Sequence, residues 1–365
     1  MFQNNYCIIM AGGIGSRFWP RSRNSCPKQF LDILDTGRTF LQQTFDRFAK
    51  IIPRENILIV TGVPYKDLVM EQLPGIDPSQ VLLEPLRRNT APCIAYATYK
   101  ILQRNPNATV VVAPSDHLIL NEIDFLQVIQ SGLHFAAAND FLITLGIKPT
   151  RPETNYGYIQ MNPADKRPSD NQMAFRVKTF TEKPNAELAK VFVESGEFFW
   201  NSGIFIWNLQ AIKQALKVHL PDISILFENG SEKYYTPAET AFIQKAYSEC
   251  PNISIDYGIM EKAKNVYMFA ADVGWSDLGT WQSLYMQQPK DAFNNVSDTK
   301  SVLFYDVSNS LVASKNKEKL IVLRGLDDYL IIDSDNVLLI HPKGDEEGFK
   351  QVVKDLDLGK NEKYM

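Results

Sequence analysis

Residues 6–30, YCIIMAGGIGSRFWPRSRNSCPKQF, decide the fold of the N-terminal part of this 365-residue chain. The apolar run Tyr6–Met10 predicts a buried strand, and three glycines follow where that strand ends. Glycines at such a place let backbone N–H groups approach phosphate oxygens, because no Cβ stands in the way. Arg17 and Lys28 add positive charge. The stretch therefore predicts a site for the phosphates of a nucleotide.

The same residues exclude two common glycine motifs. A dinucleotide-binding fingerprint has the form G-x-G-x-x-G, but the segment 13–18 lacks the third glycine, and Pro20 and Pro27 interrupt the helix that the motif needs. A P-loop has the form G-x-x-x-x-G-K-[ST], and no such string occurs. A tight turn flanked by surface basic residues stays open as the simpler interpretation of the glycines.

Composition restricts the class of protein. An apolar content of 45%, a charged content of 22% and a net charge of −4 are typical of a globular protein and argue against a nucleic-acid partner. No apolar stretch reaches the roughly 18 residues that span a bilayer, and no signal-peptide pattern opens the chain, so we expect no membrane partner. The four cysteines are far apart, which favours free thiols and a cytoplasmic location.

Apolar, β-branched runs alternate with longer helical patterns over the first part of the chain. The predicted strands are Tyr6–Met10, Asn56–Thr61, Val81–Leu83, Thr109–Ala113 and Phe141–Leu145, and the predicted helices are Thr90–Gln103, with Thr90 as N-cap, and Glu122–Ala138. This alternation predicts an α/β fold with a mostly parallel sheet and helices on both faces. In such sheets ligands bind at the carboxyl ends of the strands.

The polar segment Pro163–Met173 predicts a surface loop. The alternation of strand and helix patterns ends near residue 298. Short apolar runs split by Asn, Asp, Gly and Ser then predict a small β-rich region: Ser301–Tyr305, Ser310–Ser314, Lys319–Leu323, Tyr329–Asp333 and Asn336–His341. A short helix is expected in the charged tail. We therefore expect a catalytic domain of residues 1–290 and a second domain of residues 291–365.

Two aspartates follow apolar runs at predicted strand ends. Asp116 follows Thr109–Ala113, and Asp277 comes after Val266–Ala270. Magnesium prefers hard oxygen ligands, usually one or two carboxylates together with phosphate oxygens, so the pair is a candidate Mg²⁺ site. Each aspartate taken alone is also typical of a helix N-cap or a turn. For the neighbouring His117, a structural hydrogen bond is preferred over a role as base.

Several polar residues suit a sugar phosphate. Glu182 and Asn201 have oxygens and nitrogens that can bind adjacent hydroxyls, and Lys183 suits a phosphate. The segment Asn155–Tyr158 places a glycine between aromatic side chains. Core packing for the tyrosines and a solvated turn for Glu182 and Lys183 stay open as alternatives.

Read in order, these segments resemble the sugar-nucleotidyltransferases, and within them the mannose-1-phosphate guanylyltransferases. The motifs that carry the resemblance are GGIGSRFWPRSRNSCPKQFL, EPLRRNTAP, PSDH, NYGYI, FTEKP, FWNSGIF, SIDYGIME and GWSDLGTW, and they cover at least residues 5–285. The resemblance implies a Rossmann-like, GT-A-like catalytic domain with a mixed sheet. It also implies a short left-handed β-helix at the C-terminus.

The resemblance also implies roles for individual residues. Arg17 and Lys28 would be catalytic, and Asp116 and Asp277 would hold Mg²⁺. The nucleotide would be bound by Gly12, Gly13, Gly15, Ser16, Glu84, Asn89, Thr90 and Ser115, and the sugar phosphate by Tyr156, Gly157, Glu182, Lys183, Asn201 and Asp256. Two small departures occur, because Ser16 stands where threonine is commoner and Arg21 where an apolar residue is commoner.

The reaction that the resemblance implies is transfer of GMP from GTP to α-D-mannose 1-phosphate, which yields GDP-mannose and diphosphate. A homodimer is expected. Isomerase activity is not expected, because the sequence has no room for the cupin domain that some family members carry. Three other interpretations stay open: a sibling enzyme for another base or sugar, a non-catalytic GDP-mannose-binding homologue, and, remotely, a dinucleotide oxidoreductase.

Overall fold

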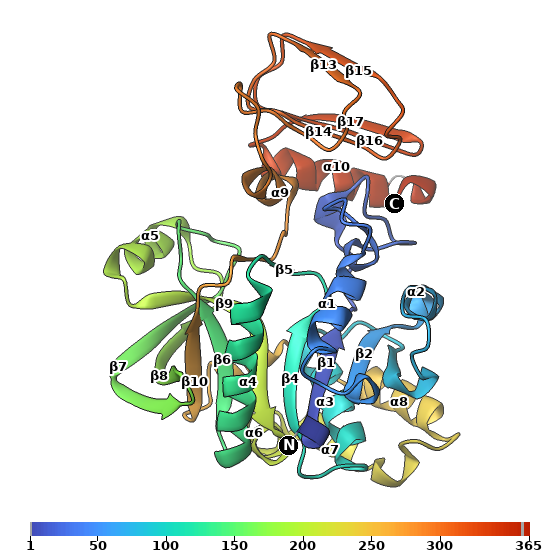
Figure 1. Ribbon diagram of the computed structural model, residues 1–365. Helices are drawn as coiled ribbons and strands as arrows, with labels where there is room; N and C mark the ends of the chain where they lie inside the picture. Colours follow the sequence, from blue (N-terminus) through green and yellow to red (C-terminus); the bar gives the residue numbers. More distant parts are fainter. Residues whose placement is uncertain (1, 359–360) are drawn as a thin grey trace. The chain divides into compact units, whose positions relative to one another are not determined.

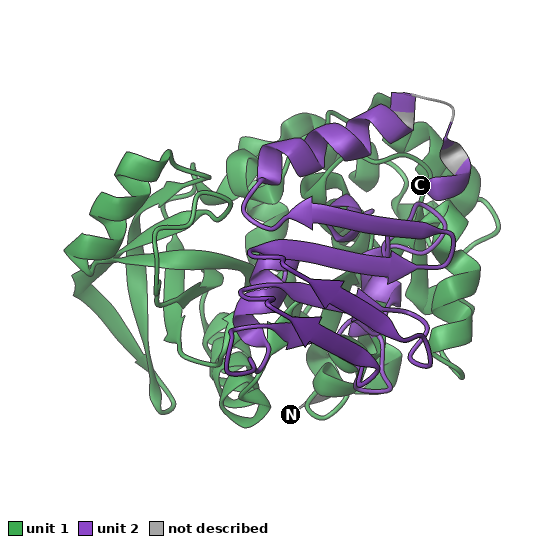
Figure 2. Cartoon of the chain, turned by 90° about the horizontal axis from the view of Figure 1, so that it is seen from above, with its two compact units in different colours: residues 1–12, 42–275 green, residues 13–41, 276–365 purple. Residues whose placement is uncertain are grey.

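The computed structural model describes residues 2–358 and 361–365. The chain divides into two compact units, shown in green and purple in Figure 2. Unit 1 comprises residues 1–12 and 42–275, and unit 2 comprises residues 13–41 and 276–365. The opening glycine loop, Gly13–Leu41, thus belongs with the C-terminal part of the chain. The domain boundary at residue 290 stays a prediction.

Unit 1 is built on a nine-stranded mixed sheet with the order β3-β2-β1-β4-β9-β6-β10-β8-β7. Its strands are β1 (Asn5–Met10), β2 (Ile57–Gly62), β3 (Val81–Glu84), β4 (Thr109–Pro114), β6 (Leu142–Ile147), β7 (Tyr158–Ser169), β8 (Gln172–Thr181), β9 (Phe198–Asn208) and β10 (Val266–Ala271). Strands β1 to β4 pair in parallel, as do β6 and β10, whereas β9 runs antiparallel between β4 and β6. The predicted α/β class with a mixed sheet is confirmed.

Helices cover both faces of this sheet (Figure 1). The helices of unit 1 are α2 (Lys66–Gln72), α3 (Thr90–Leu102), α4 (Glu122–Ala138), α5 (Ala186–Ser195), α6 (Leu209–His219), α7 (Pro221–Glu228) and α8 (Glu239–Glu249), and α1 (Phe40–Phe48) begins in unit 2 and continues into unit 1. A large apolar core joins the sheet to α3, α6, α7 and α8. Helix α3 is buried along almost its whole length, which explains its apolar composition on every side.

Two expectations about local structure are wrong. The N-cap of α3 is Asn89 and not Thr90, because the Asn89 side chain accepts a hydrogen bond from the Thr90 backbone N–H at 2.9 Å. Residues Pro163–Met173 are not a loop. They form the distal part of the antiparallel hairpin of β7 and β8, in which Lys166–Ser169 pair with Gln172–Phe175 although the segment is polar.

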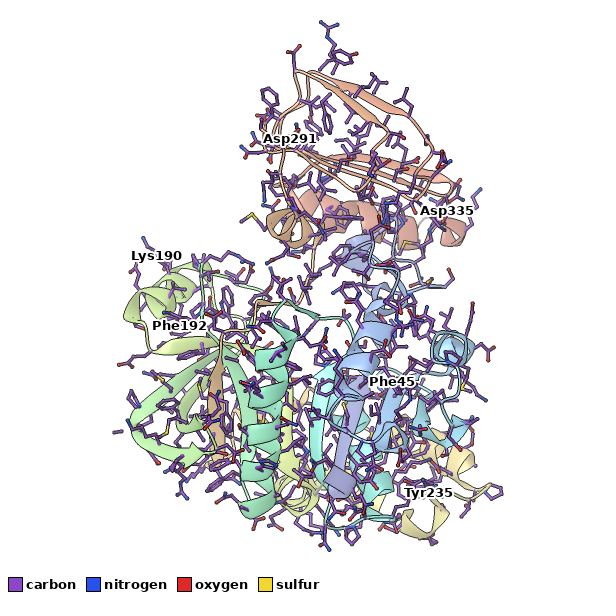
Figure 3. All side chains as sticks on the ribbon, viewed as in Figure 1. Phe45, Lys190, Phe192, Tyr235, Asp291 and Asp335 are labelled. Carbon is purple, nitrogen blue, oxygen red and sulfur yellow. The ribbon has the colours of Figure 1, made fainter. Side chains whose placement is uncertain are left out.

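Helix α5 covers the start of β9 beside this hairpin. Its Phe192 stacks on Phe198 with ring centroids 3.9 Å apart, and Figure 3 shows Phe192 on this helix. Aromatic stacking of this kind adds to the area that the two rings bury. The contact fixes the segment that leads into Trp200 and Asn201, two residues of the candidate site.

Unit 2 contains a small helical winding of mostly parallel strands, β12 to β17, hereafter the β-coil. Strands β12 (Val296–Ser297), β14 (Leu311–Ser314) and β16 (Tyr329–Ser334) pair in parallel, and β17 (Val337–Pro342) closes this sheet in the antiparallel direction. The alternate strands β13 (Val302–Tyr305) and β15 (Ile321–Arg324) pair in parallel in a second sheet. Successive strands from β12 to β16 thus alternate between two sheets, which is the arrangement of a β-helix, and the predicted C-terminal β-rich region is confirmed.

The remaining elements of unit 2 are helical. Helix α9 (Trp281–Gln287) precedes the coil, and α10 (Glu346–Leu358) lies beside β17 (Figure 2), where Phe349 packs edge-on against His341. The opening loop contributes two 3₁₀ turns, η2 (Ser16–Phe18) and η3 (Lys28–Phe30). Two short strands, β5 (Leu118–Ile119) and β11 (Trp275–Ser276), complete the described strands of the chain.

Candidate active site

The glycine loop of unit 2 turns sharply at Gly15. This residue has a φ of 60°, in the left-handed region that residues with a Cβ seldom adopt, and it precedes η2. A Cβ added to Gly15 would lie 2.6 Å from the Cβ of Lys28. Both the backbone angle and the available space therefore require glycine, and the loop packs directly on the backbone of Lys28.

Lys28 is buried in unit 2, with 3% of its surface exposed. Its Nζ donates a hydrogen bond to the backbone carbonyl of Asp277 at 2.6 Å. It also lies 5.6 Å and 5.1 Å from the ring centroids of Phe18 and Phe40. Charge-assisted hydrogen bonding and cation–π attraction hold the ammonium group in one place. The structure thus brings together Lys28 and Asp277, which are far apart in the sequence.

The rest of the loop is held by side chains that bind its carbonyl groups. Ser22 Oγ donates to the carbonyl of Ile14 at 3.0 Å, and Gln29 Nε2 donates to the carbonyl of Gly13 at 2.8 Å. Arg17 lies in η2 with its side chain exposed. The geometry gives the loop a defined backbone with an arginine on its surface, as a phosphate-binding loop needs.

Asp277 lies in a tight turn within unit 2. Its Oδ1 accepts a hydrogen bond from the Gly279 backbone N–H at 3.0 Å, and Leu278 between them has a φ of 42°. A Cβ on Gly279 would lie 2.6 Å from Asp277 Oδ2. The turn therefore limits the rotation of the carboxylate, which is a property that a metal ligand shares with a turn residue.

Three polar residues from different segments of the chain meet around Gly157 in unit 1. Asn201 of β9 donates from Nδ2 to Asp256 Oδ1 at 2.8 Å, and its backbone N–H donates to the carbonyl of Gly157 at 2.8 Å. A Cβ on Gly157 would lie 2.4 Å from Glu182 Oε2 and 3.3 Å from the Cβ of Asn201. The structure therefore assembles Gly157, Glu182, Asn201 and Asp256 into one cluster, hereafter the carboxylate cluster.

Glu182 has an unused acceptor in this cluster. Its Oε2 is buried and has no hydrogen-bond partner among the described residues, while its Oε1 lies 3.1 Å from Lys183 Nζ. Only 11% of the Glu182 side chain is exposed, against 57% of the Lys183 side chain. A buried acceptor without a partner is costly unless a ligand supplies a donor. Glu182 Oε2 is thus suited to accept a hydrogen bond from a ligand hydroxyl.

The electrostatics of the carboxylate cluster favour a ligand that brings donors. Burial, followed by the negative charge of Glu182, raises the pKa of Asp256 to about 6, and the hydrogen bond from Asn201 opposes this shift. Asp256 begins a π-helical turn, η8 (Asp256–Met260), a type of turn that is frequent at functional sites. Donors from a ligand would relieve the repulsion between the two carboxylates.

Tyr156 forms one wall beside the cluster. Its ring packs edge-on against Trp200 and Trp275, with centroids 5.2 Å apart in both pairs. Tyr156 is 7% exposed, so part of the predicted alternative, core packing, is observed. The two tryptophans are partners that sequence reasoning missed, because nothing in their local pattern relates them to Tyr156.

The residues predicted for the nucleoside lie elsewhere in unit 1. Glu84 ends β3, and its Oε1 accepts a hydrogen bond from the Tyr247 hydroxyl at 2.9 Å. A Cβ on Gly12 would lie 3.0 Å from Glu84 Oε2. Burial raises the pKa of Glu84 to about 7, and the hydrogen bond from Tyr247 limits the rise. Gly12 and Glu84 are thus brought together, and Tyr247 of α8 is a partner that the sequence analysis did not identify.

Asn89 and Thr90 form hydrogen bonds with backbone groups of unit 1. Asn89 has a φ of 67° and caps α3, and Thr90 Oγ1 accepts a hydrogen bond from the Ile255 backbone N–H at 2.9 Å. The second bond ties the start of α3 to the residue before Asp256. The nucleoside residues and the carboxylate cluster are therefore linked through one backbone segment of unit 1.

Ser115 and Asp116 follow β4, as predicted. Ser115 is buried, its backbone N–H donates to the carbonyl of Met10, and its carbonyl accepts from Thr44 Oγ1 at 3.1 Å. The adjacent His117 accepts a hydrogen bond at Nδ1 from Trp275 Nε1 at 3.1 Å. This bond agrees with the prediction that His117 forms a structural hydrogen bond.

The predicted site residues fall in both units. Gly12, Glu84, Asn89, Thr90, Ser115, Asp116, Tyr156, Gly157, Glu182, Lys183, Asn201 and Asp256 lie in unit 1, and Gly13, Gly15, Ser16, Arg17, Lys28 and Asp277 lie in unit 2. Within residues 2–358 and 361–365, no group of three or more His, Cys, Asp or Glu side chains is arranged to hold a metal ion. The pairing of Asp116 with Asp277 stays a prediction.

Comparison with known proteins agrees with this arrangement. A model of the nucleotidyl transferase family matches residues 6–293. The curated mannose-1-phosphate guanylyltransferase of Escherichia coli is 34% identical over 96% of this chain and 75% of its own length. The alginate biosynthesis protein AlgA of Pseudomonas aeruginosa is 35% identical over 96% of this chain and 72% of its own length.

Solved structures show the same fold. A crystal structure from Thermus thermophilus, named mannose-1-phosphate geranyltransferase, has a TM-score of 0.86 and 28% identity, and the match covers 97% of this chain and all of the other. The chain therefore belongs to the nucleotidyl transferase family and is an enzyme of that class. The resemblance to the mannose-1-phosphate guanylyltransferases is confirmed. None of the helices within the described residues has the length and apolar character to cross a bilayer.

Proposed function

We propose that this enzyme transfers GMP from GTP to α-D-mannose 1-phosphate and releases GDP-mannose and diphosphate. The names of the relatives support this choice of substrates. The observation that carries it is the carboxylate cluster, in which the buried Glu182 Oε2 lacks a partner opposite Gly157 among the described residues. Carboxylate and amide groups that converge in this way match the adjacent hydroxyls of a sugar.

In this proposal the carboxylate cluster holds the mannose and Lys183 binds its phosphate. Glu182 and Asp256 accept hydrogen bonds from ring hydroxyls, and Asn201 orients Asp256 through the bond at 2.8 Å. Tyr156 limits the space beside the sugar. The Lys183 side chain is 57% exposed, and its Nζ lies 3.1 Å from Glu182 Oε1, so its ammonium group can reach an anionic group beside the carboxylate cluster.

The phosphate chemistry is assigned to the glycine loop. Gly12, Gly13, Gly15 and Ser16 would bind the nucleotide phosphates, and Arg17 and Lys28 would stabilise the charge that develops as diphosphate leaves. The nucleophile is an oxygen of the sugar phosphate, which attacks the α-phosphorus in line. This oxygen is already deprotonated at neutral pH, so no general base is needed, and positioning and charge stabilisation supply the catalysis.

Asp116 and Asp277 are proposed as the protein ligands of Mg²⁺. Both side chains present the hard carboxylate oxygens that this ion prefers, and the turn at Gly279 limits the rotation of Asp277. When bound, the ion would neutralise charge on the phosphate oxygens. Glu84, Asn89, Thr90 and Ser115 are proposed at the guanine and ribose.

The test is diphosphate release with Mg²⁺ and mannose 1-phosphate, in which GTP, ATP, UTP and dTTP are compared, with glucose 1-phosphate as the alternative sugar. Turnover largely confined to GTP and mannose 1-phosphate is expected. Turnover with another base or sugar would assign the enzyme to a sibling activity. A protein that binds GDP-mannose and turns over no pair would instead be a non-catalytic homologue.

We also propose a homodimer. Strands β13, β15 and β17 of unit 2 expose large apolar side chains, namely Leu303, Tyr305, Val322, Leu338 and Ile340. These side chains lie on both sheets of the β-helix, and exposed apolar surface of this kind favours an interaction site. Light scattering at several concentrations measures the mass directly, and replacement of Val322 and Ile340 by serine should shift it toward the monomer.

A further inference from the structure

The loop Gly13–Leu41, which carries Arg17 and Lys28, contains little regular secondary structure. Its helical turns η2 and η3 are three residues long each. Turns of this length provide few backbone hydrogen bonds and are not stable by themselves. The position of Arg17 therefore depends on contacts that other segments make with the loop.

Residues 276–365 supply these contacts within unit 2. Two contacts involve Trp19: its carbonyl accepts a hydrogen bond from Trp281 Nε1 at 2.9 Å, and its own Nε1 donates to the carbonyl of Tyr364 at 2.7 Å. Lys28 Nζ donates to the carbonyl of Asp277 at 2.6 Å, and Arg23 Nη2 donates to Asn336 Oδ1 at 2.9 Å. In addition, Arg21 forms an ion pair with Asp298. The partners come from the turn after β11, from α9, from the β-coil and from the C-terminal 3₁₀ turn. Several separate elements thus bind one irregular loop.

Trp281 contacts the two residues that follow Arg17 in the sequence. Its ring lies 5.0 Å from the ring of Phe18, the residue that follows Arg17, and both rings are buried. Its indole N–H binds the carbonyl of Trp19, one residue further. The tilted ring contact and the hydrogen bond together fix two consecutive residues, so they restrict the backbone from which the Arg17 side chain extends.

A second contact restrains the glycine loop at Arg21, four residues after Arg17. The Arg21 side chain is 12% exposed and pairs with Asp298, which also accepts a hydrogen bond at Oδ1 from the Ser314 backbone N–H at 2.8 Å. Asp298 is therefore anchored to β14 and cannot follow the loop if the loop moves. A charged pair with one fixed partner restrains geometry better than one between two mobile side chains.

We infer that residues 276–365 form a brace that positions the glycine loop for phosphate transfer, with Trp281 and Asp298 as positioning residues. This inference rests on the proposed function, because it assigns these contacts a role in that reaction. Catalysis by charge stabilisation depends on placement, and a displacement of about 1 Å can cost on the order of 10²-fold in rate. Trp281 and Asp298 act on Arg17 and Lys28 and not on substrate.

The test compares Trp281→Phe with Trp207→Phe. Both changes shorten a buried tryptophan, but only Trp281 donates a hydrogen bond to the loop, whereas Trp207 Nε1 has no partner among the described residues. Trp281→Phe should lower kcat about 10-fold, the scale of one lost hydrogen bond, and leave KM for mannose 1-phosphate within about twofold. Trp207→Phe should leave both constants near those of the unchanged enzyme.

Asp298→Asn provides a second variant that keeps the acceptor for Ser314 and removes the charge opposite Arg21. Like Trp281→Phe, it should lower kcat. Hydrogen exchange of peptides from residues 13–31 gives a readout that needs no turnover, and both brace variants should exchange faster there than Trp207→Phe. If loop exchange and kcat match those of Trp207→Phe, the brace is refuted. If the unchanged enzyme shows no turnover but Trp281→Phe and Asp298→Asn still speed hydrogen exchange in the loop, the proposed function fails. The contacts of residues 276–365 then stabilise the loop without a role in this reaction.

Discussion

Gly157→Ala should impair binding of the sugar while it leaves the nucleotide largely unaffected. The added Cβ would lie 2.4 Å from Glu182 Oε2 and 3.3 Å from the Cβ of Asn201, so the Glu182 carboxylate must move. The backbone at position 157 is not in the left-handed region, so alanine introduces no strain of its own. The change therefore acts chiefly on Glu182 Oε2, the buried acceptor assigned to a mannose hydroxyl, because the approach to Asn201 is much less close.

The magnitude follows from that single hydrogen bond. A hydrogen bond to a charged group contributes about 1.5–3 kcal/mol. At about 1.4 kcal/mol for each factor of ten, its loss should raise KM for mannose 1-phosphate about 10-fold to 100-fold. KM for GTP should change by less than about twofold, because Glu84, Asn89 and Thr90 lie in a different part of unit 1.

The assay is diphosphate release at saturating GTP with mannose 1-phosphate varied. Gly344→Ala is the matched control, since a Cβ there would lie 3.6 Å from Asp328 Oδ2, an ordinary contact. The double variant Gly157→Ala/Glu182→Ala should be no worse than Glu182→Ala alone, because both changes remove the same interaction. Additive losses in the double variant, or an unchanged KM in Gly157→Ala, would refute the reasoning.

Three further predictions concern charged groups. Lys28→Ala should lower kcat about 10²-fold to 10³-fold, the scale for loss of a preorganised charge-stabilising group, and a near-normal kcat would contradict its role. Asp277→Asn should raise the Mg²⁺ concentration needed for half-maximal rate, and an unchanged metal titration would argue against Asp277 as a ligand. Burial and Glu182 raise the pKa of Asp256 from 3.8 to about 6, so ionisation of this carboxyl opposes folding at higher pH. Asp256→Asn removes this cost and should increase the free energy of unfolding in urea by about 3 kcal/mol at most at pH 7.5. This advantage should shrink as the pH falls from 6 to 4, and a pH-independent difference would exclude the cause given.

Local pattern predicted much of the fold. The apolar run at residues 6–10 lies within β1, and the helical pattern Glu122–Ala138 coincides with α4. Periodicity succeeds at such places because local side-chain spacing and burial agree. It failed at Pro163–Met173, where a polar composition predicted a loop and backbone pairing between β7 and β8 formed a hairpin.

The candidate site was predictable only in part. Glycines, arginine and lysine of the opening loop could be interpreted from their chemistry, and Glu182 and Asn201 from their hydrogen-bonding capacity. Asp256 entered only through the resemblance to a family, since a carboxylate 55 residues from Asn201 has no local signal that relates the two. Tyr247 and Trp281 were missed for the same reason.

By itself the sequence determined the α/β class and the β-rich C-terminal region, and it predicted that the glycine loop binds nucleotide phosphates, because these inferences follow from periodicity and from residue types close together in the chain. Only the tertiary structure decided that Glu182, Asn201 and Asp256 meet around Gly157, and that the opening loop packs with residues 276–365. Such contacts join residues that are distant in sequence. They arise from the way whole elements pack, and no local pattern of side chains encodes them.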